Sequence, residues 1–118
     1  MDNCCIKEDK ELCLIYSHKL FELITKKYTY TILVILDKYG KLRFNELMRK
    51  INGITQKMLS KRLKELEDAH LVKREVVTEE TIKVYYSLTT EGKAVKNAIQ
   101  ILIGVINLID GKKDSYLC

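Results

Sequence analysis

The residues best suited to chemistry in this 118-residue chain are basic side chains, and they gather in one window. Between Lys41 and Lys64 the sequence holds eight lysines and arginines against a single acid, Glu46, so this window carries +7 while the whole chain carries +5. Solubility alone would not require such concentration, whereas recognition of a polyanion would. The charge distribution therefore favours an anionic partner.

The basic residues fall at helical spacing in the segment 55–69. One face of the predicted helix is apolar and consists of Leu59, Leu63 and Leu66. The opposite face, called the lysine face below, repeats at i, i+3, i+4 and i+7 and consists of Lys57, Ser60, Lys61 and Lys64. Ordinary solvation is one interpretation of this face. A solvated helix usually alternates its charges, however, because like charges four residues apart cost roughly 0.2–0.5 kcal/mol.

The preceding residues indicate how this helix is presented. Apolar residues at helical spacing predict a short helix over 44–51, and Asn52-Gly53 supplies a turn because glycine takes a positive φ without penalty. Thr55 is suited to cap the next helix through its hydroxyl oxygen. Two helices joined across a short glycine-containing turn form a helix-turn-helix, whose second helix enters the major groove of DNA. We therefore expect residues 55–69 to be a recognition helix.

The whole chain, residues 1–118, is predicted to form a single domain, since no linker is visible. An N-terminal helix is expected over residues 10–27, a winged-helix core over 28–88 and a C-terminal helix over 89–110. Within the core, the apolar run from Tyr28 to Tyr39 has a β-branched content that would also suit a strand. Its spacing and the following glycine favour a buried helix.

A β-hairpin is predicted after the recognition helix. Two runs rich in β-branched and aromatic residues, 71–77 and 82–88, flank the polar sequence TEET. Alternation places four side chains on one face of the second strand, namely Ile82, Val84, Tyr86 and Leu88. The predicted fold class is therefore mainly α with a small antiparallel β-hairpin: a winged helix-turn-helix with N- and C-terminal dimerisation helices.

The C-terminal helix is apolar around nearly its full circumference from Ala94 to Ile109. Such a helix requires burial on all sides, which one small core cannot supply, so we expect a homodimer. The expected interface residues are Leu12, Leu20, Phe21, Val95, Ile99, Leu102, Val105, Ile106 and Ile109. A two-fold dimer would place two recognition helices about 34 Å apart and would require a roughly palindromic site on double-stranded DNA.

Candidate DNA contacts come from the helix-turn-helix and from the wing, residues 72–88. They are Arg43, Thr55, Gln56, Lys57, Ser60, Lys61, Lys64, Arg74 and Lys83. Lysines neutralise phosphates and release counterions, and Gln56, Lys57 and Ser60 are placed to meet base edges. For Arg74 an ion pair with Glu75 or Glu67 is an equally good interpretation.

Several sequence strings resemble a known family. They are RFNEL at 43–47, GITQKMLS at 53–60, LKELE at 63–67 and YSLT at 86–89, followed by Gly92. The chain is similar here to the HxlR-type branch of the MarR-like winged-helix regulators. That resemblance implies a homodimer that controls nearby genes, commonly in response to redox or electrophilic stress. The chain departs from the family where TKKY at 25–28 replaces Gly-Gly-Lys-Trp and where Thr81-Ile82 replaces a proline pair in the wing.

The resemblance also bears on the cysteines. Many family members carry a sensor cysteine at the position of Ile15, two residues from Cys13. Cys13 is therefore a candidate redox sensor; the alternative is a small buried apolar residue. The four cysteines lack the paired spacing of a zinc site, and His18 and His70 stand alone, so no metal site is expected.

No phosphate loop or nucleophile elbow is present, so we expect neither an enzyme nor a cofactor. The N-terminus lacks the pattern of a signal peptide, and no uninterrupted apolar run has the length of a membrane span, so we expect a cytoplasmic protein without a membrane partner. Two alternatives to a DNA-binding regulator remain: a winged-helix module that binds proteins without contacting DNA, and an RNA-binding winged helix.

Overall fold

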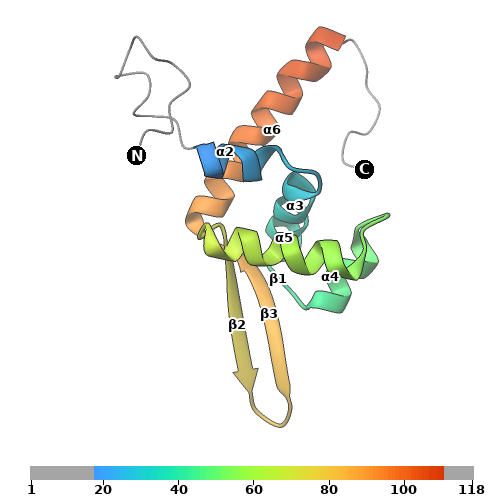
Figure 1. The fold of residues 1–118 in the computed structure, drawn as a ribbon, viewed down its shortest axis with the longest axis vertical. Helices are drawn as coiled ribbons and strands as arrows, with labels where there is room; N and C mark the ends of the chain where they lie inside the picture. The colour runs from blue at the N-terminus through green and yellow to red at the C-terminus, as the bar shows by residue number, and fades with distance from the viewer. Residues whose placement is uncertain (1–17, 111–118) are drawn as a thin grey trace.

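The computed structural model describes residues 18–110. Figure 1 shows the helices α2 (His18–Thr25), α3 (Thr29–Tyr39), α4 (Phe44–Lys50), α5 (Gln56–Asp68) and α6 (Thr90–Asp110), and the strands β1 (Lys41–Leu42), β2 (Val72–Thr78) and β3 (Ile82–Leu88). The predictions for residues 10–17, which include Leu12 and Cys13, lie outside the described residues.

The core is built around α3, which confirms the prediction of a buried helix. Ile32, Leu33 and Leu36 on α3 are at most 1% exposed. Leu47 from α4 and Leu59, Leu63 and Leu66 from α5 complete the same cluster. Gly40 ends the helix at φ +83°, and its N–H donates to the carbonyl of Leu36. β-branched residues are tolerated in this helix because burial in the core outweighs their weak local preference for strands.

The helix-turn-helix forms as predicted. Gly53 in the turn between α4 and α5 has φ +80°. The hydroxyl oxygen of Thr55 accepts a hydrogen bond from the N–H of Met58 at 3.1 Å and so caps α5. Ile54 before the cap and Leu59 after it are both buried, so the entry of α5 is held by apolar packing as well as by a hydrogen bond.

The wing is part of a three-stranded antiparallel sheet in the order β1-β3-β2. The two-residue strand β1 was not predicted, because its length gives no periodic signal; it pairs Leu42 with Tyr86. In Figure 1 the hairpin of β2 and β3 extends away from the helices. Tyr86 and Leu88 at its base pack against the core, whereas Ile82 near its tip is 72% exposed. The predicted apolar face of β3 is therefore buried only where the strand lies against the helices.

The helix α6 starts at a well-defined cap. The hydroxyl of Thr89 accepts a hydrogen bond from the N–H of Gly92 and donates one to the carbonyl of His70. Its first half lies on α3, where the ammonium of Lys96 is 2.8 Å from a carboxylate oxygen of Asp37. This ion pair holds the pKa of Asp37 below its ordinary value, chiefly through the hydrogen bond from Lys96.

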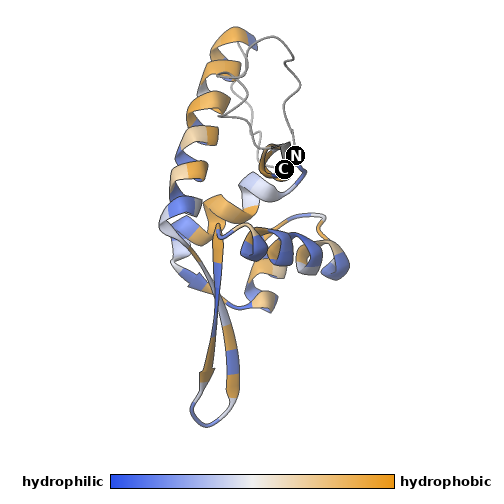
Figure 2. Cartoon of the chain, turned by 60° about the vertical axis from the view of Figure 1, so that its left-hand side comes forward, coloured by the Kyte–Doolittle hydropathy of each residue, from blue (hydrophilic) through white to orange (hydrophobic). Residues whose placement is uncertain are grey.

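The second half of α6 projects away from the rest of the chain, and its ribbon is largely hydrophobic (Figure 2). By length and composition alone, this 21-residue helix is long and apolar enough to cross a membrane. The basic residues of its first half, however, are ion paired to Asp37 on α3. The remaining part, 97–110, is shorter than the roughly 20 apolar residues that a membrane span needs.

Candidate nucleic-acid interface

The lysine face of α5 points away from the core. Lys57, Ser60, Lys61 and Lys64 are all exposed, while Leu59, Leu63 and Leu66 on the opposite side are at most 2% exposed. Within residues 18–110, none of these three lysines has an ion-pair partner. Their positive charges therefore remain available to an anionic partner.

The N-terminal end of α5 adds polar groups beside the lysine face. Gln56 is exposed and lies with Asn45 and Arg49 of α4 along a shallow depression. Thr55 uses its hydroxyl oxygen for the helix cap, which leaves the hydroxyl hydrogen free to donate. Asn45 and Arg49 were missed from the sequence, although their i, i+4 spacing on the polar side of α4 was a signal that could have identified them.

Arg43 and Lys41 flank α4 but differ in their roles. The side chain of Arg43 is exposed, and its backbone N–H donates to the carboxylate of Glu46 at 2.8 Å. The ammonium of Lys41 is 2.9 Å from a carboxylate oxygen of Glu75 on β2. The hydrogen bond from Lys41 lowers the pKa of Glu75. Lys41 thus ties β1 to the wing and adds little to the free positive charge.

The wing carries basic residues on both of its faces. Arg74 pairs with Tyr86 across the hairpin, whereas Lys83 pairs with Val77. Because side chains alternate along a strand, this register places Arg74 and Lys83 on opposite faces. Both are exposed, and the described residues offer Arg74 no ion pair, since the carboxylate of Glu75 binds Lys41 instead.

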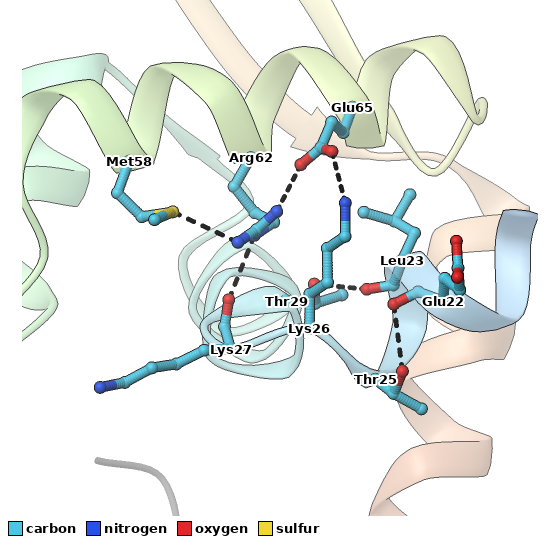
Figure 3. Close-up of polar contacts among 9 residues, drawn as sticks. All are labelled: Glu22, Leu23, Thr25, Lys26, Lys27, Thr29, Met58, Arg62 and Glu65. Atoms are coloured by element: carbon cyan, nitrogen blue, oxygen red, sulfur yellow. Dashed lines mark hydrogen bonds and ion pairs between the residues drawn. The ribbon is translucent and has the colours of Figure 1, made fainter.

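Arg62 is basic like its neighbours on α5 but points inward (Figure 3). It is 5% exposed, and its guanidinium contacts the carbonyl of Lys27, the carboxylate of Glu65 and the sulfur of Met58. Lys26 binds the same carboxylate at 2.7 Å. Burial alone would raise the pKa of Glu65, but hydrogen bonds from Lys26 and Arg62 outweigh it and keep this pKa below its ordinary value. Arg62 therefore does not add to the free charge of the window.

Among residues 18–110, no group of three or more His, Cys, Asp or Glu side chains is placed to hold a metal ion. Exposed polar and basic side chains are present on α5, on α4 and on the wing.

A helix-turn-helix that packs on a third helix and is followed by a two-stranded hairpin defines the winged helix-turn-helix class. Comparison with protein families then gives a narrower result. The family described as "HxlR-like helix-turn-helix" matches residues 23–112, and the chain belongs to this family. The resemblance drawn from the sequence strings is thereby confirmed.

Known proteins agree with this assignment. The chain is 42% identical over 81 residues to the HTH-type transcriptional regulator YodB of Bacillus subtilis (strain 168), covering 68% of this chain and 70% of YodB. The reduced form of YodB superposes with a TM-score of 0.70 at 35% identity, covering 79% of this chain and 93% of that one. The redox regulator HypR in its oxidized form superposes with a TM-score of 0.66 at 32% identity, covering 81% and 95%. These proteins are named as regulators rather than enzymes.

Proposed function

We propose that the protein is a transcriptional regulator that binds double-stranded DNA as a homodimer. In this proposal α5 lies in the major groove and the wing lies on the adjacent groove or backbone. The lysine face carries the proposal, because it is exposed, unpaired and positioned on the second helix of a helix-turn-helix. A protein-binding module without DNA contacts would not need three unneutralised lysines on that helix.

The candidate DNA contacts fall into groups according to the chemistry of their side chains. Gln56, Lys57 and Ser60 on the N-terminal half of α5 are suited to base edges, and Asn45 and Arg49 extend the same surface. Lys61 and Lys64 are suited to phosphates, as charges that hold the protein without reading sequence. Arg43, Thr55, Arg74 and Lys83 border this surface and are proposed as further contacts.

The dimer would form along α6. A heptad-spaced row of apolar side chains, called the α6 seam below, is exposed along this helix and consists of Ala94, Ala98, Ile101, Val105 and Leu108. Ile101 and Leu108 are 70% and 84% exposed, a degree of exposure that a second copy of the helix would relieve. Leu102, Ile106 and Ile109 border the seam and are also exposed, as is Phe21 on α2.

Three residues expected at the interface have another contact in the structure. Leu20, Val95 and Ile99 are partly buried against the core of the same chain. Val95 and Ile99 lie one helical position beyond Ala94 and Ala98, so the face of α6 that they occupy is turned toward α3. In the proposed dimer the seam, rather than Val95 and Ile99, forms the centre of the contact.

Selection of bound duplexes from a random pool tests the function and the symmetry together. We expect the selected sites to be palindromes with half-sites one DNA turn apart. Sedimentation of Ile101→Asp tests the dimer, with Gln100→Glu, an exposed position of the same helix outside the seam, as the matched control. We expect Ile101→Asp to be monomeric and the control to remain dimeric. A wild-type protein that is monomeric at micromolar concentration would contradict the dimer.

Redox control by Cys13 stays a proposal, supported by the redox regulator HypR among the structural relatives. DNA affinity measured before and after mild oxidation, for the wild type and Cys13→Ser, tests it. We expect oxidation to change the affinity of the wild type alone. The proposed role in gene control also places the protein in the cytoplasm, where it reaches its operator.

A further inference from the structure

We propose that Arg62 is a positioning residue that sets the rotation of α5 about its own axis and thereby the sequence selectivity of the lysine face. This inference rests on the proposed DNA binding. It concerns a side chain that contacts neither solvent nor, in that proposal, DNA, since Arg62 is 5% exposed and lies on the inner side of α5.

Three groups fix the guanidinium of Arg62 (Figure 3). Its Nε donates to the carbonyl oxygen of Lys27 at 3.1 Å, and one terminal nitrogen lies 3.2 Å from the sulfur of Met58. The other terminal nitrogen donates to the carboxylate of Glu65. A guanidinium holds its donors in a rigid plane, so contacts in several directions determine its orientation. Lys27 lies in the turn between α2 and α3, so one of these contacts joins α5 to a distant part of the chain.

The contact between Arg62 and the carbonyl of Lys27 is called the first strut below, and a second strut joins the same turn to α5. Lys26, in the same turn, places its ammonium 2.7 Å from Glu65 on α5. The turn itself is held in place, because the hydroxyl of buried Thr29 donates to the carbonyl of Leu23 at 2.7 Å. Two polar links therefore connect one side of α5 to a fixed anchor.

These links supply what the apolar contacts of α5 do not. Leu59, Leu63 and Leu66 bury the helix, but apolar attraction has no preferred direction and tolerates small rotations. Hydrogen bonds weaken steeply with angle and distance. Because side chains extend to a radius of about 5–6 Å, a rotation of about 20° would shift their ends by about 2 Å. Such a shift breaks hydrogen bonds to base edges but hardly changes attraction to phosphates, which acts over about 8–10 Å.

The test compares two affinities for each variant: one for the selected operator and one for a scrambled duplex of the same length. Arg62→Lys keeps the charge but loses the planar fork. We expect the ratio of the two affinities to fall about tenfold, roughly the loss of one well-formed base contact. The scrambled-duplex affinity and its dependence on salt should stay unchanged. Lys26→Met removes only the exposed strut, and we expect it to lower the ratio in the same direction.

Leu66→Ala is the control, because it opens a cavity on the inner side of α5 and lowers the melting temperature without touching either strut. We expect it to keep the wild-type ratio in the folded protein. The inference is overturned if Arg62→Lys and Lys26→Met keep that ratio, or if Leu66→Ala lowers it equally. A wild type that prefers no duplex sequence would overturn the proposed function and this inference with it. A selective wild type with equally selective Arg62→Lys and Lys26→Met variants would overturn this inference alone.

Discussion

Replacing Lys57, Lys61 and Lys64 together by glutamine should abolish most DNA binding without unfolding the protein. Glutamine keeps a long, polar, helix-compatible side chain, so the change removes charge with little effect on helix propensity. The three ammonium groups have no ion-pair partners within residues 18–110, so no carboxylate is orphaned by the substitution. Lys57 and Lys61 are four residues apart, and relief of their repulsion should stabilise α5 by roughly 0.2–0.5 kcal/mol.

The size of the effect follows from counterion release. Each phosphate neutralised contributes about 0.9 to the slope of log affinity against log salt. Lys61 and Lys64, the two lysines assigned to phosphates, then contribute about 3.6 in a dimer. Between 50 and 200 mM salt, the wild type should lose roughly a hundredfold more affinity than the triple variant. At 50 mM salt the triple variant should therefore bind the duplex more weakly than the wild type does.

Fluorescence anisotropy of a labelled duplex at several salt concentrations measures both quantities. The matched control replaces Lys19, Lys27 and Lys38 by glutamine. These exposed lysines lie outside the lysine face and likewise have no ion-pair partner within residues 18–110, so the control removes the same charge. We expect the control to keep nearly the wild-type slope, and thermal melting should show that both variants are folded. An unchanged slope in the lysine-face variant, or an equal fall in the control, would refute the reasoning.

Three further outcomes are expected. Gly92→Ala should lower the free energy of unfolding by about 1–3 kcal/mol or more in chemical denaturation, because the added Cβ would lie 2.0 Å from the carbonyl oxygen of Leu71. Replacing Glu79 and Glu80 by glutamine should strengthen duplex binding in the same anisotropy assay, because both acids are exposed at the wing tip and repel phosphates; weaker binding would contradict this. Asp37→Asn should lower the melting temperature at neutral pH. Because the pKa of Asp37 is lowered in the folded state, the difference from the wild type should persist above the ordinary carboxyl pKa and vanish as pH falls through the folded-state value.

The local elements were predictable because their signals lie within a few residues of one another. The turn glycine at Gly53, the cap at Thr55 and the apolar spacing of α5 specify a helix-turn-helix without reference to the rest of the chain. The hairpin was predictable for the same reason, since both strands flank one polar turn. The short strand β1 was not, because two residues have no periodicity, and its pairing with β3 joins segments more than forty residues apart.

The sequence by itself determined that a basic helix follows a tight turn and that an apolar helix ends the domain. Only the tertiary structure decided which charges are free. Lys41 and Arg62 look like their neighbours in the sequence, yet one binds Glu75 on the wing and the other is buried against Lys27. It also decided which side of α6 stays exposed, since α3 covers one side of its first half. The reason is physical: spacing along the chain sets which side chains share a face, whereas the partner of that face comes from segments far away in the sequence.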